Sequence, residues 1–369
     1  MIEKGRISNI QSAMLAITSL TIMGHLIVLT LVISHSKENG WIAAIIGTAL
    51  GLIGIVAVTR LSQRFPGLTL IEILFRHFSW PGKIAAIVYL LYFFILTLLA
   101  VRLFGEAYKS ILYETPLTAF IVIILLVSAY AVYLGLETIG RMNQIMLPIL
   151  VVMAIVVAYL TMPNKDYSNL LPILGEGWMP VGAGALSVMG WFGEIVIMGM
   201  LLPYVQKPER LMKANLWVAA LTLIFFLGPV TGPVAMFGAT EAAKMTFPTF
   251  SEVRYIEAGE VLNRFDAIAV LFWTVGLLFR ISIFYYGLCL GTAQALKLKT
   301  YRPLVLPFGW LIGAGSLWFA ADYEEIQSFL FGVYAPLNIT MGALLPVLLL
   351  LLSRLIQKLR KRKEVAEER

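Results

Sequence analysis

The sequence predicts an all-α integral membrane protein with ten transmembrane helices. Of its 369 residues, 60% are apolar and only 13% are charged, whereas soluble domains have roughly 45–50% apolar and about 25% charged residues. A soluble chain of this length cannot bury the excess, because the surface buried on folding is limited by chain size. Lipid must therefore cover it. This composition excludes a nucleic-acid-binding protein, a cytosolic enzyme and a disordered scaffold.

Ten stretches are long enough to cross a bilayer, which requires about 20 predominantly apolar residues per helix. Three of them carry a titratable residue near the middle, namely His25, Glu194 or Arg280. The first stretch is too long for a signal peptide and lacks a small-residue cleavage pattern. The expected spans are 10–33, 41–59, 84–106, 118–136, 142–162, 181–205, 216–240, 266–290, 303–321 and 330–353. We expect a single membrane domain over 1–369 that ends in a basic tail at 354–369.

The distribution of Lys and Arg predicts that both termini are cytoplasmic. With the amino terminus inside, 20 of the 28 basic residues fall on the cytoplasmic side, as the positive-inside rule requires. The tail basic residues follow the last span directly and would contact anionic lipid head groups. Docking of a protein partner on the tail is the alternative.

Ten spans divide into two sets of five, so that the first and sixth spans correspond. Both contain a glycine, then an ionisable residue, then a run of aliphatic residues. The matching stretches are Met23-Gly24-His25-Leu26-Ile27-Val28 and Phe192-Gly193-Glu194-Ile195-Val196-Ile197. Because five is odd, the second set enters from the opposite side, and the two repeats are inverted. Many secondary transporters build a mid-membrane substrate site from such repeats with interrupted first helices.

The glycines of these two spans are candidates for a binding segment. A glycine inside a helix costs about 1 kcal/mol relative to alanine, and the free backbone groups of an opened helix are tolerated only where they line a cavity. We predict opening at Gly24, Gly190 and Gly193, which lie beside titratable residues. Close helix packing through small residues is the alternative, and we assign it to Gly182 and Gly184.

Glu194 is the most informative single residue. An ionised side chain at mid-bilayer costs at least about 2.5 kcal/mol, so it is expected to face the protein interior and have a partner. Arg280 is the first candidate partner, and His25 is the second. A structural ion pair would explain both charges without a ligand, and His25 has the alternative of a hydrogen-bonded packing residue. The predicted ligand-binding residues are Gly24, His25, Gly190, Trp191, Gly193, Glu194, Thr274 and Arg280.

Two features are expected at the outer surface. Arg102 and Glu106 fall near the outer end of the third span, where snorkelling to the interface would satisfy them unless they line an entrance. The segment 241–265 has Phe250, Val253, Ile256 and Val261 at roughly helical spacing, and charged residues, among them Glu252, fill the other positions. It is expected to form an amphipathic helix, acting either as a lid or as a connector.

No enzymatic chemistry is expected. Catalysis requires a clustered acid, base or nucleophile constellation, and the sequence has no paired-carboxylate, histidine-rich or phosphate-loop motif. Cys289 is the only cysteine, which excludes a disulfide framework and a cysteine-based metal site. We therefore predict no catalytic residues, no metal and no cofactor.

Several motifs resemble a known family. They are Leu61-Ser62-Gln63-Arg64-Phe65-Pro66-Gly67, Thr69-Leu70-Ile71-Glu72, Asn169-Leu170-Leu171-Pro172, Leu202-Pro203-Tyr204 with Lys207-Pro208, and Asn263-Arg264-Phe265-Asp266 followed by Trp273. In this order and spacing the chain resembles the B-type subunit of spore-germination nutrient receptors. That family is the endospore permease-like branch of the amino acid/polyamine/organocation transporter superfamily.

The resemblance implies a LeuT-like fold, a spore inner-membrane location and recognition of a small nutrient such as an amino acid. It also implies an A-type membrane subunit and a C-type lipoprotein as partners. Sodium-coupled relatives of this architecture bind the ion with oxygens of the first and eighth helices. Here Arg280 lies between Thr274 and Ser282 and would repel a cation. The expected function is a germinant sensor, with an ion-coupled amino acid permease as the alternative.

Overall fold

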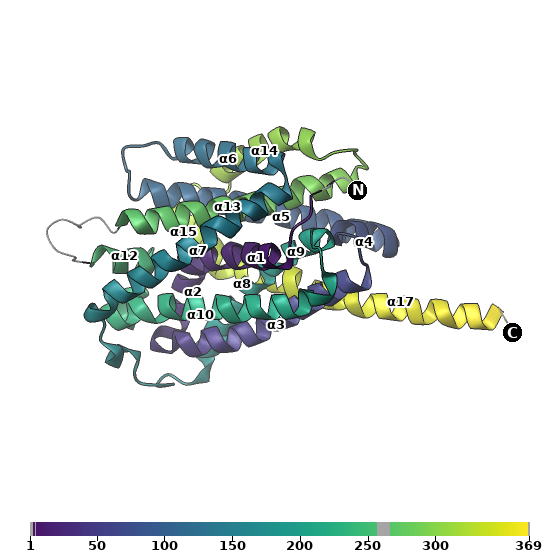
Figure 1. Cartoon of the computed structure of the whole chain (residues 1–369). Helices are drawn as coiled ribbons and strands as arrows, with labels where there is room; N and C mark the ends of the chain where they lie inside the picture. The colour runs from purple at the N-terminus through teal and green to yellow at the C-terminus, as the bar shows by residue number, and fades with distance from the viewer. Residues whose placement is uncertain (1–2, 4, 257–265, 368–369) are drawn as a thin grey trace.

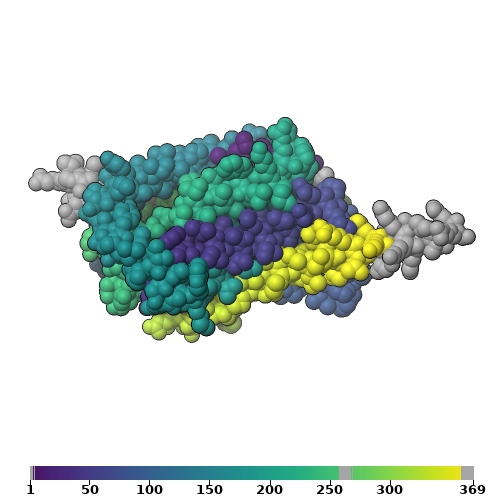
Figure 2. Space-filling model, turned by 90° about the horizontal axis from the view of Figure 1, so that it is seen from below, coloured from purple at the N-terminus to yellow at the C-terminus, as the bar shows by residue number. Residues whose placement is uncertain are grey.

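The computed structural model describes residues 3, 5–256 and 266–367, and every regular element in this part of the chain is helical. Long helices run side by side through the molecule, with α6 and α14 forming an outer layer (Figure 1). The last helix, α17, packs along α3 (Figure 2) and then continues beyond the body (Figure 1). The α-helices of eight or more residues are α1 Asn9–Met23, α2 Leu29–Ser36, α3 Gly40–Arg64, α4 Leu70–His77, α5 Ser79–Lys109, α6 Leu117–Leu134, α7 Leu136–Thr161, α8 Trp178–Gly193, α10 Leu211–Phe237, α13 Asp266–Ala295, α14 Val305–Trp318 and α17 Leu345–Glu367.

Shorter helical segments join the long ones. The short α-helices are α9 Met198–Leu201, α11 Ala239–Ala242, α12 Pro248–Arg254, α15 Tyr323–Phe329 and α16 Ala335–Ile339. Three π-helical segments interrupt the α-helical geometry: η1 Gly24–Val28, η9 Leu330–Tyr334 and η10 Thr340–Leu344. A 3₁₀ segment, η5 Glu194–Ile197, follows α8. The first and sixth expected spans thus both change helix type beside the glycine of the repeated motif.

Local sequence explains where helices start. Ser8 caps α1, since its hydroxyl accepts from the Gln11 amide at 3.1 Å while the Gln11 side chain accepts from the Ser8 amide at 2.9 Å. Thr69 and Glu72 form the same reciprocal capping box before α4. Each box satisfies amide groups that the first turn of a helix leaves without a partner.

Eight helices of the described residues are long and apolar enough to cross a membrane, against the ten expected. One difference lies in Asn9–Arg64, a single helical run of 56 residues that contains two expected spans. Within this run α2 ends at Ser36, and the next residue, Lys37, adopts a left-handed φ of 47°. The other difference is α14, which has only 14 residues where 303–321 was expected.

The segment that follows α10, up to residue 256, packs against neighbouring helices, including α10 and α13. Phe250, Val253 and Ile256 are buried, as the amphipathic pattern predicts. Glu252 was expected on the polar face, but it is also buried and pairs with Lys165 at 2.7 Å. Its carboxylate is accommodated because Gly232 on α10 has no side chain at this point. The end of the predicted helix, including Val261, lies outside the described residues.

Candidate functional site

Glycines bring α8 into very close contact with α16 and η10. A β-carbon on Gly190 would lie 2.8 Å from the Ala335 Cα, and one on Gly193 would lie 2.2 Å from the Asn338 carbonyl oxygen. No side chain fits at these distances. The α-helix gives way to 3₁₀ geometry directly after Gly193, so that the last turn of α8 positions Glu194 in the interior.

Glu194 and Arg280 form a buried, two-pronged ion pair. Arg280 Nη2 donates to Glu194 Oε1 at 2.8 Å, and Arg280 Nη1 donates to Glu194 Oε2. The exposed fraction of the side chains is 1% for Glu194 and 0% for Arg280. The predicted partnership is confirmed. Two parallel hydrogen bonds between ionised groups fix geometry as well as charge.

Three further groups complete the cluster. The Tyr334 hydroxyl donates to Glu194 Oε1 at 2.7 Å, and Arg280 Nη1 donates to the Ser19 carbonyl at 3.1 Å. The guanidinium also lies over the Phe284 ring, 4.9 Å from its centroid. The pair therefore connects α1, η5, η9 and α13. Sequence reasoning missed Tyr334 and Ser19, since one is an ordinary tyrosine in an apolar span and the other contributes only its carbonyl.

Two tyrosines of α5 bind the elements that pack against the α8 glycines. The Tyr92 hydroxyl donates to Asn338 Oδ1 at 2.7 Å, and the Tyr89 hydroxyl donates to the Met341 carbonyl at 2.9 Å. Both side chains are buried. They join α5 to α16 and η10, the same elements that pack on the α8 glycines.

Trp191 connects α8 to the first helix. Its indole Nε1 donates to the Leu20 carbonyl at 2.9 Å, and a β-carbon on Gly24 would lie 2.7 Å from the indole ring. Gly24 thus lies where the π-helical segment begins and where Trp191 approaches.

The backbone from Met23 to Leu29 keeps right-handed helical dihedrals, and α8 is continuous through Gly190 to Gly193. The predicted opening at these glycines is therefore wrong: the helices change type at Gly24 and after Gly193 without unwinding, and the glycines allow close packing.

The other predicted residues lie apart from the ion pair. His25 packs against Phe272 with ring centroids 5.2 Å apart and faces a small cavity between α1, α7, α10 and α13. Thr274 donates to the Val270 carbonyl at 2.6 Å and contacts the Tyr108 hydroxyl. The described contacts therefore place Gly24 against Trp191, and Glu194 against Arg280. His25 and Thr274 contact other helices.

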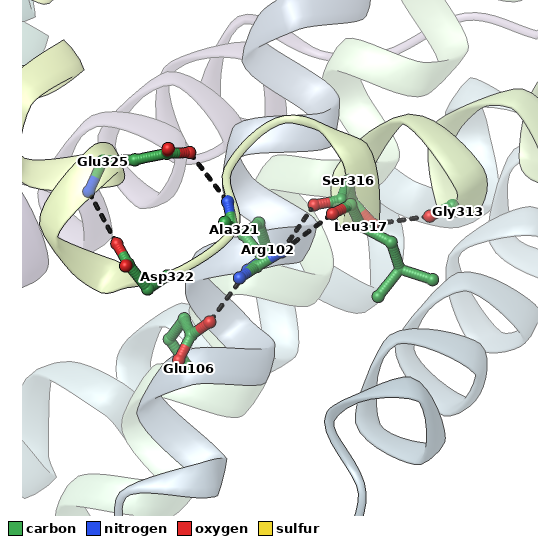
Figure 3. A network of polar contacts seen from close by, with 8 residues as sticks. All are labelled: Arg102, Glu106, Gly313, Ser316, Leu317, Ala321, Asp322 and Glu325. Atoms are coloured by element: carbon green, nitrogen blue, oxygen red, sulfur yellow. Dashed lines mark hydrogen bonds and ion pairs between the residues drawn. The ribbon is translucent and has the colours of Figure 1, made fainter.

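Arg102 and Glu106 are paired in the interior and do not snorkel (Figure 3). Arg102 Nε donates to Glu106 Oε1 at 2.8 Å, and the exposed fractions of the side chains are only 4% and 13%. Arg102 Nη1 also donates to the carbonyls of Ser316 and Leu317 at the end of α14. These carbonyls have no partner within the helix. Arg102 therefore caps the carboxyl end of α14, and these hydrogen bonds keep its side chain inside the protein.

The helices and the buried charges define a multi-pass membrane protein with a polar cluster in its interior. The comparison with protein families matches a model described as spore germination protein over residues 6–322. The chain belongs to this family of spore germination proteins, as its motifs predict.

Named relatives agree with this assignment. The chain is 28% identical over 323 residues to spore germination protein YndE of Bacillus subtilis (strain 168), covering 86% of this chain and 88% of the relative. It is 27% identical over 302 residues to spore germination protein XB of Bacillus anthracis, covering 80% and 83%. It is 25% identical over 301 residues to spore germination protein KB of Bacillus subtilis (strain 168), covering 79% and 80%.

Proposed function

We propose that this chain is the membrane subunit of a spore germinant receptor that recognises an amino acid. Membership of the spore germination family supports the role in germination. The proposed location is the spore inner membrane, with both termini cytoplasmic. The proposed partners are an A-type membrane subunit and a C-type lipoprotein, with anionic lipid beside the tail at 354–369.

The Glu194–Arg280 pair is the observation that supports an amino acid as the ligand. An amino acid zwitterion carries one negative and one positive group, and each can bind the oppositely charged side chain of the pair. Its carboxylate is complementary to Arg280, and its ammonium group is complementary to Glu194. Tyr334 and the Ser19 carbonyl already supply a donor and an acceptor at the same place. A ligand inserted between the two side chains would thus replace each buried charge partner with another, and no charge would be left uncompensated.

Exchange of partners provides a physical basis for sensing. The ion pair joins the first helix, η5, η9 and α13, so it favours the conformation in which these elements are close. A ligand shifts a conformational equilibrium only through its different affinity for the two states. The ligand would bind more tightly to the state in which Glu194 and Arg280 are separated than to the state in which they are paired. The partner subunits would respond to the resulting movement of α8 and α13.

An ion-coupled amino acid permease is the alternative. The Thr274 and Ser282 hydroxyls donate to the Val270 and Leu278 carbonyls of their own helix. Arg280 lies between them with its positive charge buried, and such a charge repels a cation at short range. This arrangement favours a sensor over a sodium symporter.

A LeuT-like arrangement of ten spans in two inverted sets of five belongs to the same proposal. The left-handed Lys37 supports two crossings within Asn9–Arg64, because it ends the first helix before the second begins. The beginning of the described chain and the end of α17 lie at the same end of the bundle (Figure 1), as an even number of spans requires. The paired changes of helix type at Gly24 and after Gly193 support the repeat.

The decisive experiment measures equilibrium binding of radiolabelled amino acids to the purified protein in lipid nanodiscs. We expect saturable binding of at least one amino acid, and its loss in Glu194→Gln. Glu252→Gln is the matched control, because it breaks another buried ion pair, with Lys165, outside the cluster. Proteoliposomes should show no uptake driven by sodium or a proton gradient. Gradient-driven accumulation of an amino acid would establish the permease alternative. Equal loss of binding in Glu194→Gln and Glu252→Gln would show that the Glu194–Arg280 pair is not the binding site.

A further inference from the structure

A small cavity lies beside the first helix, separate from the Glu194–Arg280 pair. It is bounded by one face of α1 and η1, which contributes Thr18, Thr21 and His25, and by residues of α7, α10 and α13. Phe272 and Gly276 form the α13 side, and Gly276 lies one helical turn before Arg280. The space is sufficient for only a few water molecules. It is therefore too small for most amino acids, and its ligand must be a smaller molecule.

Two buried polar atoms beside the cavity have no protein partner. They are Thr21 Oγ1 and His25 Nε2, for which the described residues supply no hydrogen bond. Because Nε2 has no hydrogen-bond partner, we assign the interaction of His25 with the Phe225 backbone carbonyl to Nδ1 and place the proton on that nitrogen. A neutral imidazole has one donor and one acceptor nitrogen, so Nε2 carries the lone pair and requires a donor. Within a bilayer each unsatisfied polar group costs several kcal/mol.

A third unpartnered group lies one side chain away. Thr18, which borders the cavity, donates to Asn143 Oδ1 at 2.8 Å, and Asn143 Nδ2 has no partner among the described residues. Two of these groups belong to residues that line the cavity: an acceptor at His25 and a hydroxyl at Thr21 that serves as donor or acceptor. Asn143 lies behind Thr18. Water matches this set, because it donates twice and accepts twice. A metal ion or an anion does not match it, since neither satisfies donors and acceptors together.

We propose that this cavity is a water-binding site in which His25 Nε2 and Thr21 Oγ1 hold at least one water molecule. Buried waters typically make about three hydrogen bonds to groups that the protein leaves unsatisfied. Here the water connects the start of the π-helical segment, at His25, to the hydroxyl one turn earlier, at Thr21. His25 is thereby assigned a hydration role apart from the proposed nutrient site, so this inference does not depend on nutrient binding.

X-ray hydroxyl-radical footprinting with mass spectrometry tests the site, because radiolysis of a bound water oxidises the side chains beside it. The protein is irradiated in lipid nanodiscs, and oxidation of His25 and Phe272 is compared with that of Phe192, which is fully buried elsewhere. We expect both rings to be oxidised faster than Phe192 in the wild-type protein. In Thr21→Val the Phe272 rate should fall towards that of Phe192, whereas Thr21→Ser, which keeps the hydroxyl, should retain it.

A Phe272 rate equal to that of Phe192 in the wild-type protein, or a rate unchanged in Thr21→Val, would overturn the proposal. A second measurement does not depend on any variant. The chain has three histidines, so ¹⁵N-histidine labelling gives few resonances to assign. We expect His25 to be neutral with its proton on Nδ1 and with Nε2 accepting a hydrogen bond from water. A proton on Nε2 would contradict the assigned hydrogen bonding.

Discussion

Tyr334 and Arg280 bind the same carboxylate oxygen of Glu194, at 2.7 Å and 2.8 Å respectively. An oxygen shared by a hydroxyl and a guanidinium is held from two directions by elements far apart in the chain, namely η9 and α13. The position of Glu194 therefore depends on three helices at once. This dependence makes the cluster sensitive to the loss of either donor.

Removing the Tyr334 hydroxyl should have a smaller effect than removing the Glu194 charge. Tyr334→Phe loses one hydrogen bond to a charged group, worth about 1.5–3 kcal/mol. Glu194→Gln leaves Arg280 buried without a counter-charge, which costs about 3–5 kcal/mol. Thermal unfolding in nanodiscs should rank the wild-type protein above Tyr334→Phe, and Tyr334→Phe above Glu194→Gln. Exchange of Glu194 and Arg280 should restore part of the loss; no recovery would show that Ser19 and Phe284 matter more than charge.

Gly193 should tolerate no side chain, whereas Gly182 on the same helix should. A β-carbon on Gly193 would contact the Asn338 carbonyl at 2.2 Å, while nothing lies within 4 Å of one on Gly182, so the close packing predicted for Gly182 is wrong. Gly193→Ala should separate α8 from α16 and lower the unfolding temperature. Gly182→Ala should raise stability by roughly 0.5–1 kcal/mol, the usual gain for alanine in a helix. Equal stability of the two variants would show that α8 can move away without cost.

Loss of Arg102 should loosen the end of α14 without disturbing the Glu194 cluster. Arg102→Lys keeps the charge but lacks the planar fork that reaches Glu106 and two carbonyls together. Hydrogen–deuterium exchange should rise from Ser316 to Glu325 (Figure 3). Arg141→Lys is the control, because its ion pair with Glu137 is exposed and such pairs contribute little. Unchanged exchange in Arg102→Lys would mean that α14 ends without help from Arg102.

The proposed topology predicts which single cysteines an impermeant thiol reagent can reach. Cys289 is buried and can be replaced by serine to give a cysteine-free background. Cysteines at the exposed positions Asn164 and Glu241 should react from outside intact cells, and one at the exposed Gln206 should react only after permeabilisation. Reaction of the Gln206 cysteine from outside would reverse the proposed orientation.

Sequence reasoning predicted the class of protein and the main charged partnership. Apolar runs located the helices, because each span must satisfy its own backbone hydrogen bonds in lipid. Glu194 and Arg280 could be paired from sequence, since a lone buried charge is too costly to leave without a partner. Arg102 and Glu106 show the limit of this reasoning. Their position near a span end suggested snorkelling, but contact with α14 keeps them inside.

The amino-acid sequence by itself determined that this chain is a helical membrane protein of the spore germination family, because composition and motif order are properties of the chain. Only the tertiary structure decided which groups surround the ion pair. Ser19 and Leu20 contribute backbone carbonyls, which every residue possesses, and their roles follow from where α1 passes α13 and Trp191. The role of the glycines likewise depends on which helices pack against them. Such contacts join residues more than a hundred positions apart, and no local pattern encodes them.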